Sequence, residues 1–69
     1  MDEYEARSVV MPFGKYRDWE IGEIADDDKG LRYLDWLRGE GIRSSRLSEA
    51  VEIVLGTELN SRRLNAIAR

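Results

Sequence analysis

Apolar and polar residues follow two different periods along this chain of 69 residues. Over residues 8–13 they alternate, which is typical of a β-strand. A polar turn at residues 14–18 follows, and apolar character resumes over residues 19–24. This pattern predicts a β-hairpin near the N-terminus. Pro12 has no N–H to donate, so we expect it at an edge or at the end of the first strand.

The period lengthens to that of an amphipathic helix after the acidic residues 26–28. Acids are favoured at this position, because a helix N-terminus is stabilised by capping and by negative charge. Gly39 or Gly41 is expected to end the helix. At 100° per residue its apolar residues occupy one broad arc, formed by Leu31, Tyr33, Leu34, Trp36 and Leu37.

A second amphipathic helix is predicted to begin at Ser44 or Ser45, both of which are capping residues. Apolar residues beyond Gly56 fall out of phase with this helix, which indicates a break near Gly56 and Thr57. A short third helix then runs to about Ala68. The apolar stripe of the second helix consists of Leu47, Ala50, Val51, Val54 and Leu55.

These elements predict an α+β fold, in which an N-terminal β-hairpin packs against two amphipathic helices and a short third helical segment follows. Residues 1–7 are expected to form a flexible acidic tail, and residues 8–69 a single small domain.

So short a chain can bury only a small core, and aromatic rings contribute the most burial per residue. We therefore expect Phe13, Tyr33 and Trp36 in the core. Tyr16 stands inside the polar turn, where its ring either folds back onto the hairpin or points outward.

Composition narrows the range of functions. The chain has no cysteine and no histidine, which excludes disulfides, Ser-His and Cys-His nucleophiles and ordinary zinc sites. We therefore expect a protein that is not an enzyme and needs no cofactor. The acidic start lacks the pattern of a signal peptide, and no run approaches the ~20 apolar residues of a membrane span. A cytoplasmic protein is the simplest interpretation.

Charge is distributed unevenly about the net value of −3. Residues 1–28 carry nine acids and three bases, whereas residues 29–69 carry eight bases and five acids. An acidic protein is not expected to wrap nucleic acid without specificity, but local basic contacts remain open. Most of the bases are arginine, which pairs in a planar, bidentate manner with carboxylate or phosphate.

The polar turn contains the best candidate site. Lys15, Tyr16 and Arg17 combine two cations with an aromatic ring, as contacts to phosphates and bases do. Arg43 and Arg46, near the start of the second helix, would extend this site if the fold brings them together. The alternative is that the turn is an ordinary solvated loop.

A divalent-cation site is a further possibility. Glu23 and the run Asp26, Asp27 and Asp28 offer the hard oxygen ligands that Mg²⁺ and Ca²⁺ prefer. The alternative, which we favour, is a helix N-terminus in which one aspartate caps the helix and the others interact with its dipole.

Two stretches, "MPFGKYRDWEIGEIADDD" and "LRYLDWL", resemble a known family. They are similar to the small C-terminal domain of exodeoxyribonuclease X-like proteins and to short free-standing bacterial and phage proteins, labelled as a domain of unknown function or a quorum-sensing-regulated virulence factor. Residues 12–17 fit its Pro-Phe-Gly-Lys-Tyr/His-Lys/Arg pattern. Asp18 stands where the family usually has glycine, which implies a less tight turn. Association with an exonuclease implies that some members work near nucleic acid.

We therefore expect a non-enzymatic accessory module that binds single-stranded nucleic acid or a nucleoprotein weakly. The alternative is a bacterial or phage adaptor that binds a protein partner through its acidic N-terminal half. Leu59, Leu64 and Ile67 either fold back as the third helix or form a homodimer contact with another copy.

Overall fold

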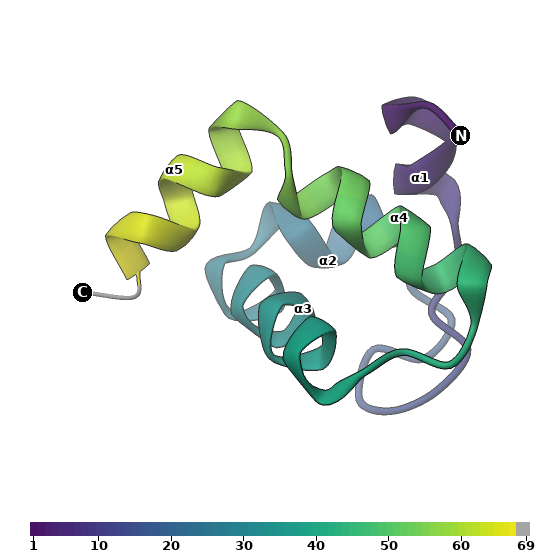
Figure 1. The fold of residues 1–69 in the computed structure, drawn as a ribbon. Coiled ribbons are helices and arrows are strands. Elements are labelled where there is room, and N and C mark those ends of the chain that lie inside the picture. Colours follow the sequence, from purple (N-terminus) through teal and green to yellow (C-terminus); the bar gives the residue numbers. More distant parts are fainter. Residues whose placement is uncertain (68–69) are drawn as a thin grey trace.

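The computed structural model describes residues 1–67, which form five helices around a single core (Figure 1). The helix α1 packs on α4 and α2, and α3 packs on α2, α4 and α5. No helix in this range is long and apolar enough to cross a membrane. In chain order the helices are α1 (Glu3–Ser8), α2 (Ile21–Asp26), α3 (Asp28–Glu40), α4 (Ser45–Leu55) and α5 (Glu58–Ile67).

The predicted α+β class and its β-hairpin are wrong. Residues 1–67 contain no sheet, and strand-like pairing is limited to one isolated antiparallel bridge between Val10 and Glu20. The backbone N–H groups of Met11 and Ile21 donate across this bridge, each at 2.8 Å. One further backbone bond, from the Asp18 N–H to the Met11 carbonyl at 2.9 Å, closes the loop. No ladder forms, because Pro12 has no donor and Ile21 already begins α2.

Helix α2 replaces the expected second strand. Its buried residues Ile21, Ile24 and Ala25 recur at the i, i+3, i+4 spacing of a helix. At its start the Glu20 N–H donates to the Glu23 carboxylate at 3.0 Å, which is one half of a capping box. The alternating interpretation of residues 19–24 missed this longer period.

The segment expected as a flexible tail forms α1 instead. Asp2 caps the helix by accepting a hydrogen bond of 2.7 Å from the Glu5 N–H. Ala6 is fully buried, and Arg7 donates to the Gly22 carbonyl. A helix of this length is not stable alone, so packing on α4 and α2 must hold it in place.

The three helices predicted after residue 26 are confirmed by α3, α4 and α5. The side chain of Ser44 caps α4 by accepting from the Leu47 N–H, and Gly41 follows α3 with a φ of +96°. The break near Gly56 is also confirmed. The predicted end of the third helix, near Ala68, lies outside the described residues.

The core is more aliphatic than expected. Phe13 and Trp36 were predicted to be core residues, but about half of each is exposed, and Tyr33 is only partly buried. Tyr16 folds back and is buried. The largest fully buried side chains are those of Met11, Ile21, Ile24, Leu31, Leu34, Leu55, Val51 and Val54.

Candidate functional site

Four aromatic rings form a continuous row across the surface between the 9–20 loop and α3. The ring centroids of Trp19 and Tyr16 are 5.3 Å apart, those of Tyr16 and Tyr33 are 5.0 Å apart, and those of Tyr33 and Trp36 are 5.7 Å apart. Tyr16 in the middle is buried, whereas the two ends are open, with Trp19 46% and Trp36 57% exposed. We call these four residues the aromatic row.

The backbone of the loop holds Tyr16 in this row. Gly14 and Asp18 both adopt left-handed conformations, with φ of +79° and +73°. The Arg17 N–H donates to the Gly14 carbonyl at 3.2 Å, and the Trp19 N–H donates to the Tyr16 carbonyl at 3.0 Å. Asp18 therefore has the backbone conformation that glycine adopts most readily.

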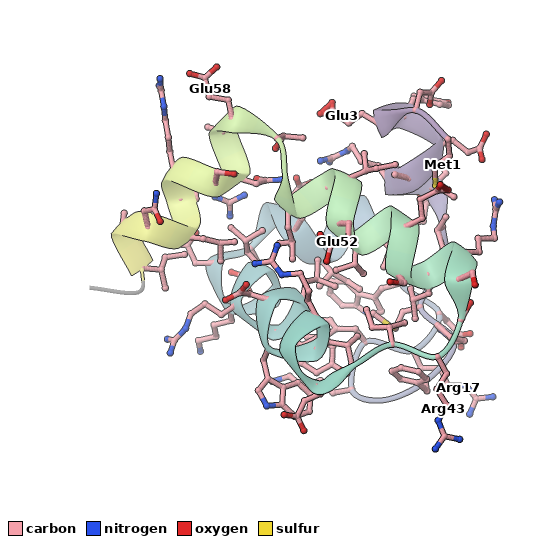
Figure 2. The ribbon with its side chains drawn as sticks, in the orientation of Figure 1. Met1, Glu3, Arg17, Arg43, Glu52 and Glu58 are labelled. Carbon is pink, nitrogen blue, oxygen red and sulfur yellow. The ribbon has the colours of Figure 1, made fainter. Side chains whose placement is uncertain are left out.

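The structure divides the predicted site residues into two groups. Lys15 and Arg17 are exposed, and the Lys15 Nζ lies 5.5 Å from the centroid of the Tyr16 ring. Figure 2 shows Arg17 and Arg43 extending toward the same end of the molecule. Tyr16 is too buried to stack on a base directly. Arg46 points elsewhere, and its Nη1 lies 3.6 Å from a carboxylate oxygen of Glu5 on α1.

Further cations lie on α3 beside the aromatic row. Arg32 and Trp36 line the same hollow between α3 and α5, with a volume of about 260 Å³. Lys29 is four residues before Tyr33, so the two share one side of the helix. Among residues 1–67, no ion pair within 4.0 Å is found for Lys15, Arg17, Lys29, Arg32 or Arg43.

Comparison with known proteins identifies the family. Residues 4–67 match the model of a family described as "Putative quorum-sensing-regulated virulence factor". The chain belongs to this family. No curated protein and no solved structure matches it. The resemblance to exodeoxyribonuclease X-like proteins has no support in these comparisons. Because the family match includes every residue of the aromatic row, the row is part of the virulence-factor family domain.

The acidic run of this family member anchors two other helices. The Asp26 carboxylate accepts a hydrogen bond from Arg7 of α1 at 3.1 Å, and that of Asp28 accepts one from Arg63 of α5 at 3.0 Å. Asp27 is the N-cap residue of α3, but its side chain makes no capping hydrogen bond. No group of three or more His, Cys, Asp or Glu residues suited to a metal ion is found within residues 1–67. These contacts give the run a structural role.

The candidate site predicted from the sequence included neither the two tryptophans nor Arg32. Trp36 was assigned to the broad apolar arc of α3, yet the buried residues of this helix are Gly30, Leu31, Leu34 and Leu37. Trp36 follows Leu34 by two positions, which places it about 200° around the helix. A narrower arc centred on the leucines would have predicted that Trp36 lies outside the core.

Proposed function

We propose that this protein is a non-enzymatic accessory module that binds single-stranded nucleic acid, alone or in a nucleoprotein, through the aromatic row. One observation carries the proposal: the row ends in two half-exposed indoles, Trp19 and Trp36, beside cations that have no ion-pair partner within residues 1–67. An exposed aromatic ring offers a stacking surface to any base, and nearby cations neutralise phosphates.

Each residue of the proposed site has a distinct role. Trp19 and Trp36 supply the stacking faces, and stacking is worth about 1–3 kcal/mol per base. Tyr16 and Tyr33 hold the indoles in place, since each indole packs against one of them. Arg32, which lines the same hollow as Trp36, is placed for a phosphate next to a base stacked there.

Negative charge close to the row limits the affinity. Asp18 is adjacent in sequence to Trp19, and Asp35 lines the hollow that contains Trp36. With about two to four phosphates neutralised, the slope of log affinity against log salt should be about −1.4 to −2.8. We therefore propose weak binding that is strongest at low salt.

The chain offers a direct optical test, because both of its tryptophans are in the aromatic row. Titration with a short oligothymidylate at ~50 mM salt should quench the intrinsic tryptophan fluorescence, and the quenching should fall as salt rises. No quenching at this salt, with the protein folded, would contradict the proposal.

Variants test whether binding depends on the aromatic row or on any exposed aromatic ring. Trp36→Ala and Trp19→Ala should each weaken binding about fivefold or more, the equivalent of about 1 kcal/mol of stacking. The matched control is Tyr4→Ala, which removes an exposed ring from α1. Fluorescence anisotropy of a labelled oligonucleotide measures all three without relying on tryptophan emission. Equal losses in the control would exclude a specific role of the row.

Charge variants test the phosphate contacts in the same assay. Arg32→Ala should weaken binding to all sequences and reduce the magnitude of the salt slope by about 0.7. The control Arg62→Ala removes an exposed arginine of α5 that is paired with Glu58. Lys15→Ala with Arg17→Ala should also reduce the slope. An unchanged slope in Arg32→Ala would exclude a phosphate contact by Arg32.

The second candidate function is an adaptor that binds a protein partner through the acidic N-terminal half. Figure 2 shows Glu3 at the end of the molecule opposite Arg17 and Arg43, which favours a separate acidic surface there. However, Asp2, Glu5, Asp26 and Asp28 interact within the chain. Failure of the oligonucleotide titration would make this the leading function.

A further inference from the structure

Val10 turns both of its backbone hydrogen-bonding groups away from Glu20. The bonds across their bridge are made by the flanking residues, with the N–H groups of Met11 and Ile21 as donors. In such a non-hydrogen-bonded antiparallel pair, the N–H and C=O of the central residue point to the outer edge. Within residues 1–67 neither group of Val10 has a hydrogen-bond partner in the backbone. One strand-like position is therefore left open.

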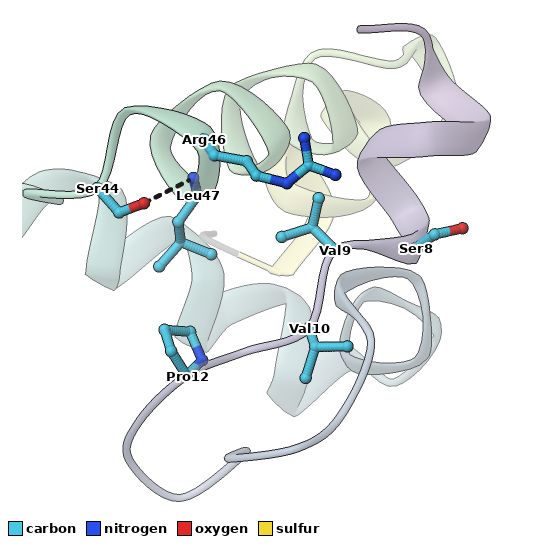
Figure 3. A pocket seen from close by; sticks show the side chains of 7 residues that line it. All are labelled: Ser8, Val9, Val10, Pro12, Ser44, Arg46 and Leu47. Atoms are coloured by element: carbon cyan, nitrogen blue, oxygen red, sulfur yellow. Dashed lines mark hydrogen bonds between the residues drawn. The ribbon is translucent and has the colours of Figure 1, made fainter.

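A groove follows this open edge (Figure 3). It has a volume of about 390 Å³ and lies between residues 8–12 and the start of α4. Val9, Pro12 and Leu47 give it apolar walls, and Arg46 is its charged residue. In Figure 3 the Arg46 side chain extends above Val9. We call this feature the edge groove.

We propose that the edge groove binds an extended peptide that carries an acidic side chain. The peptide backbone would donate to and accept from Val10, adding a short strand beside residues 9–12, and its carboxylate would pair with Arg46. Adding a strand to an open edge satisfies backbone groups, while side-chain contacts set the specificity. This binding is separate from that at the aromatic row.

The charge of the groove favours an acidic occupant because Arg46 is only loosely held. Its Nη1 lies 3.6 Å from the Glu5 carboxylate, and the two side chains are 64% and 51% exposed. An ion pair of this length in water contributes little. An incoming carboxylate can therefore displace Glu5, whereas a basic peptide would gain nothing from Arg46. Because Pro12 has no N–H, Val10 supplies the main-chain donor for the added strand.

The test uses the full chain, labelled with ¹⁵N, and synthetic end-blocked peptides. The parent peptide alternates valine and threonine around a central glutamate. We expect titration to shift the amide signals of Val10 and Leu47 and to slow hydrogen exchange at the Val10 amide. Absence of these changes with the parent peptide would overturn the proposal.

Modified peptides leave the protein unchanged and so avoid any effect on folding. Replacing the glutamate by lysine should weaken binding about tenfold, as the loss of a charge-assisted contact does. Peptides N-methylated at alternate residues, made in both registers, should bind as well as the parent in one register and about tenfold more weakly in the other. Parent-like binding by both methylated peptides would exclude strand addition.

Variants of the protein then test Arg46. Arg46→Ala should remove the preference for the glutamate peptide over the lysine peptide, and Arg46→Lys should restore part of it. Glu5→Gln should strengthen binding of the parent peptide, because the intramolecular competitor is gone. Arg62→Ala is the matched control and should change neither. Weaker binding by a folded Glu5→Gln variant would overturn the role of Arg46.

Two more measurements define the occupant and the site. Trp36→Ala should leave peptide binding unchanged, because the edge groove and the aromatic row share no residue. Val10 signals that shift with protein concentration, without peptide, would show that a second copy occupies the groove and would overturn the peptide proposal.

Discussion

The phenol oxygen of Tyr33 lies 2.7 Å from the point that a β-carbon would occupy on Gly14. Gly14 also has a φ of +79°, in the left-handed region that other residues adopt at a cost. The Tyr33 ring packs between those of Tyr16 and Trp36, which limits how far it can move. The loop therefore needs a residue without a side chain at this position in order to approach α3.

Gly14→Ala should lower the free energy of unfolding by about 1–3 kcal/mol, because it combines left-handed strain with overpacking. Gly39→Ala is the matched control, since a β-carbon there meets no atom within 4 Å and the residue lies inside α3. Gly39→Ala should raise the free energy of unfolding by about 0.5–1 kcal/mol. Urea denaturation measures both. Changes of the same sign would show that the loop tolerates a β-carbon.

Asp18→Gly should stabilise the protein by about 0.5–1 kcal/mol, because the native φ is +73° and glycine adopts this conformation without strain. Asp18→Ala separates backbone strain from charge, as it removes the same carboxylate but tolerates the left-handed region less well than aspartate. We expect no gain from Asp18→Ala in thermal unfolding. Equal gains from both variants would assign the effect to charge.

Trp36→Ala should cost less than about 1.5 kcal/mol, although an aromatic core residue would cost 3–5 kcal/mol. The reason is its exposure at the end of the aromatic row, where much of the ring is already in water. Leu34→Ala, in the same helix and fully buried, should cost about 2–5 kcal/mol. If chemical denaturation ranks the two in the opposite order, the exposed placement of Trp36 is wrong.

Arg63→Ala should lower the free energy of unfolding by about 1–3 kcal/mol, since Arg63 donates hydrogen bonds to the Ala25 carbonyl at 2.6 Å and to Asp28 at 3.0 Å. The Arg63 side chain is only 23% exposed, whereas that of its neighbour Arg62 is 75% exposed. Arg62→Ala should therefore change stability by less than about 0.5 kcal/mol. Equal melting temperatures for the two variants would contradict the anchoring of α5.

Self-association through α5 remains a prediction to be measured by light scattering. Leu64 and Ile67 pack against the core, whereas Leu59 is exposed. We expect a monomer in which α5 folds back on α3, because a single exposed leucine buries too little surface for a stable dimer. A dimer that becomes monomeric on Leu59→Ser would instead support the homodimer alternative.

The sequence predicted the helices that follow residue 26 because α3 and α4 have long apolar stripes and clear ends, and the break near Gly56 separates α5 from them. Ser44 caps α4, and Gly41 and Gly56 stand at helix ends. These signals are local, so a single sequence is enough to read them. The helix α1 was not predicted, because it has no such stripe. Its stability depends on contacts with α4, which a local sequence pattern cannot reveal.

The structure of the first part of the chain was predicted wrongly, because short segments fit both the period of a strand and the period of a helix. Apolar residues at 19 and 21 are compatible with alternation, and the helical spacing becomes clear only when Ile24 and Ala25 are included. The candidate site was predicted in part for a related reason. Lys15 and Arg17 lie on the surface, but which aromatic rings accompany them depends on how the loop crosses α3, which is a tertiary property.

The dependence of α1 on α4 has a consequence for the order in which the protein acquires its structure during synthesis. Residues 3–8 leave the ribosome early, but α4 is complete only after Leu55 has emerged. A six-residue helix does not persist without its partner, so this segment stays unfolded until α4 has been made. Docking of α1 on α4 must therefore wait until residues 45–55 have emerged, and until then residues 3–8 are open to proteases and chaperones.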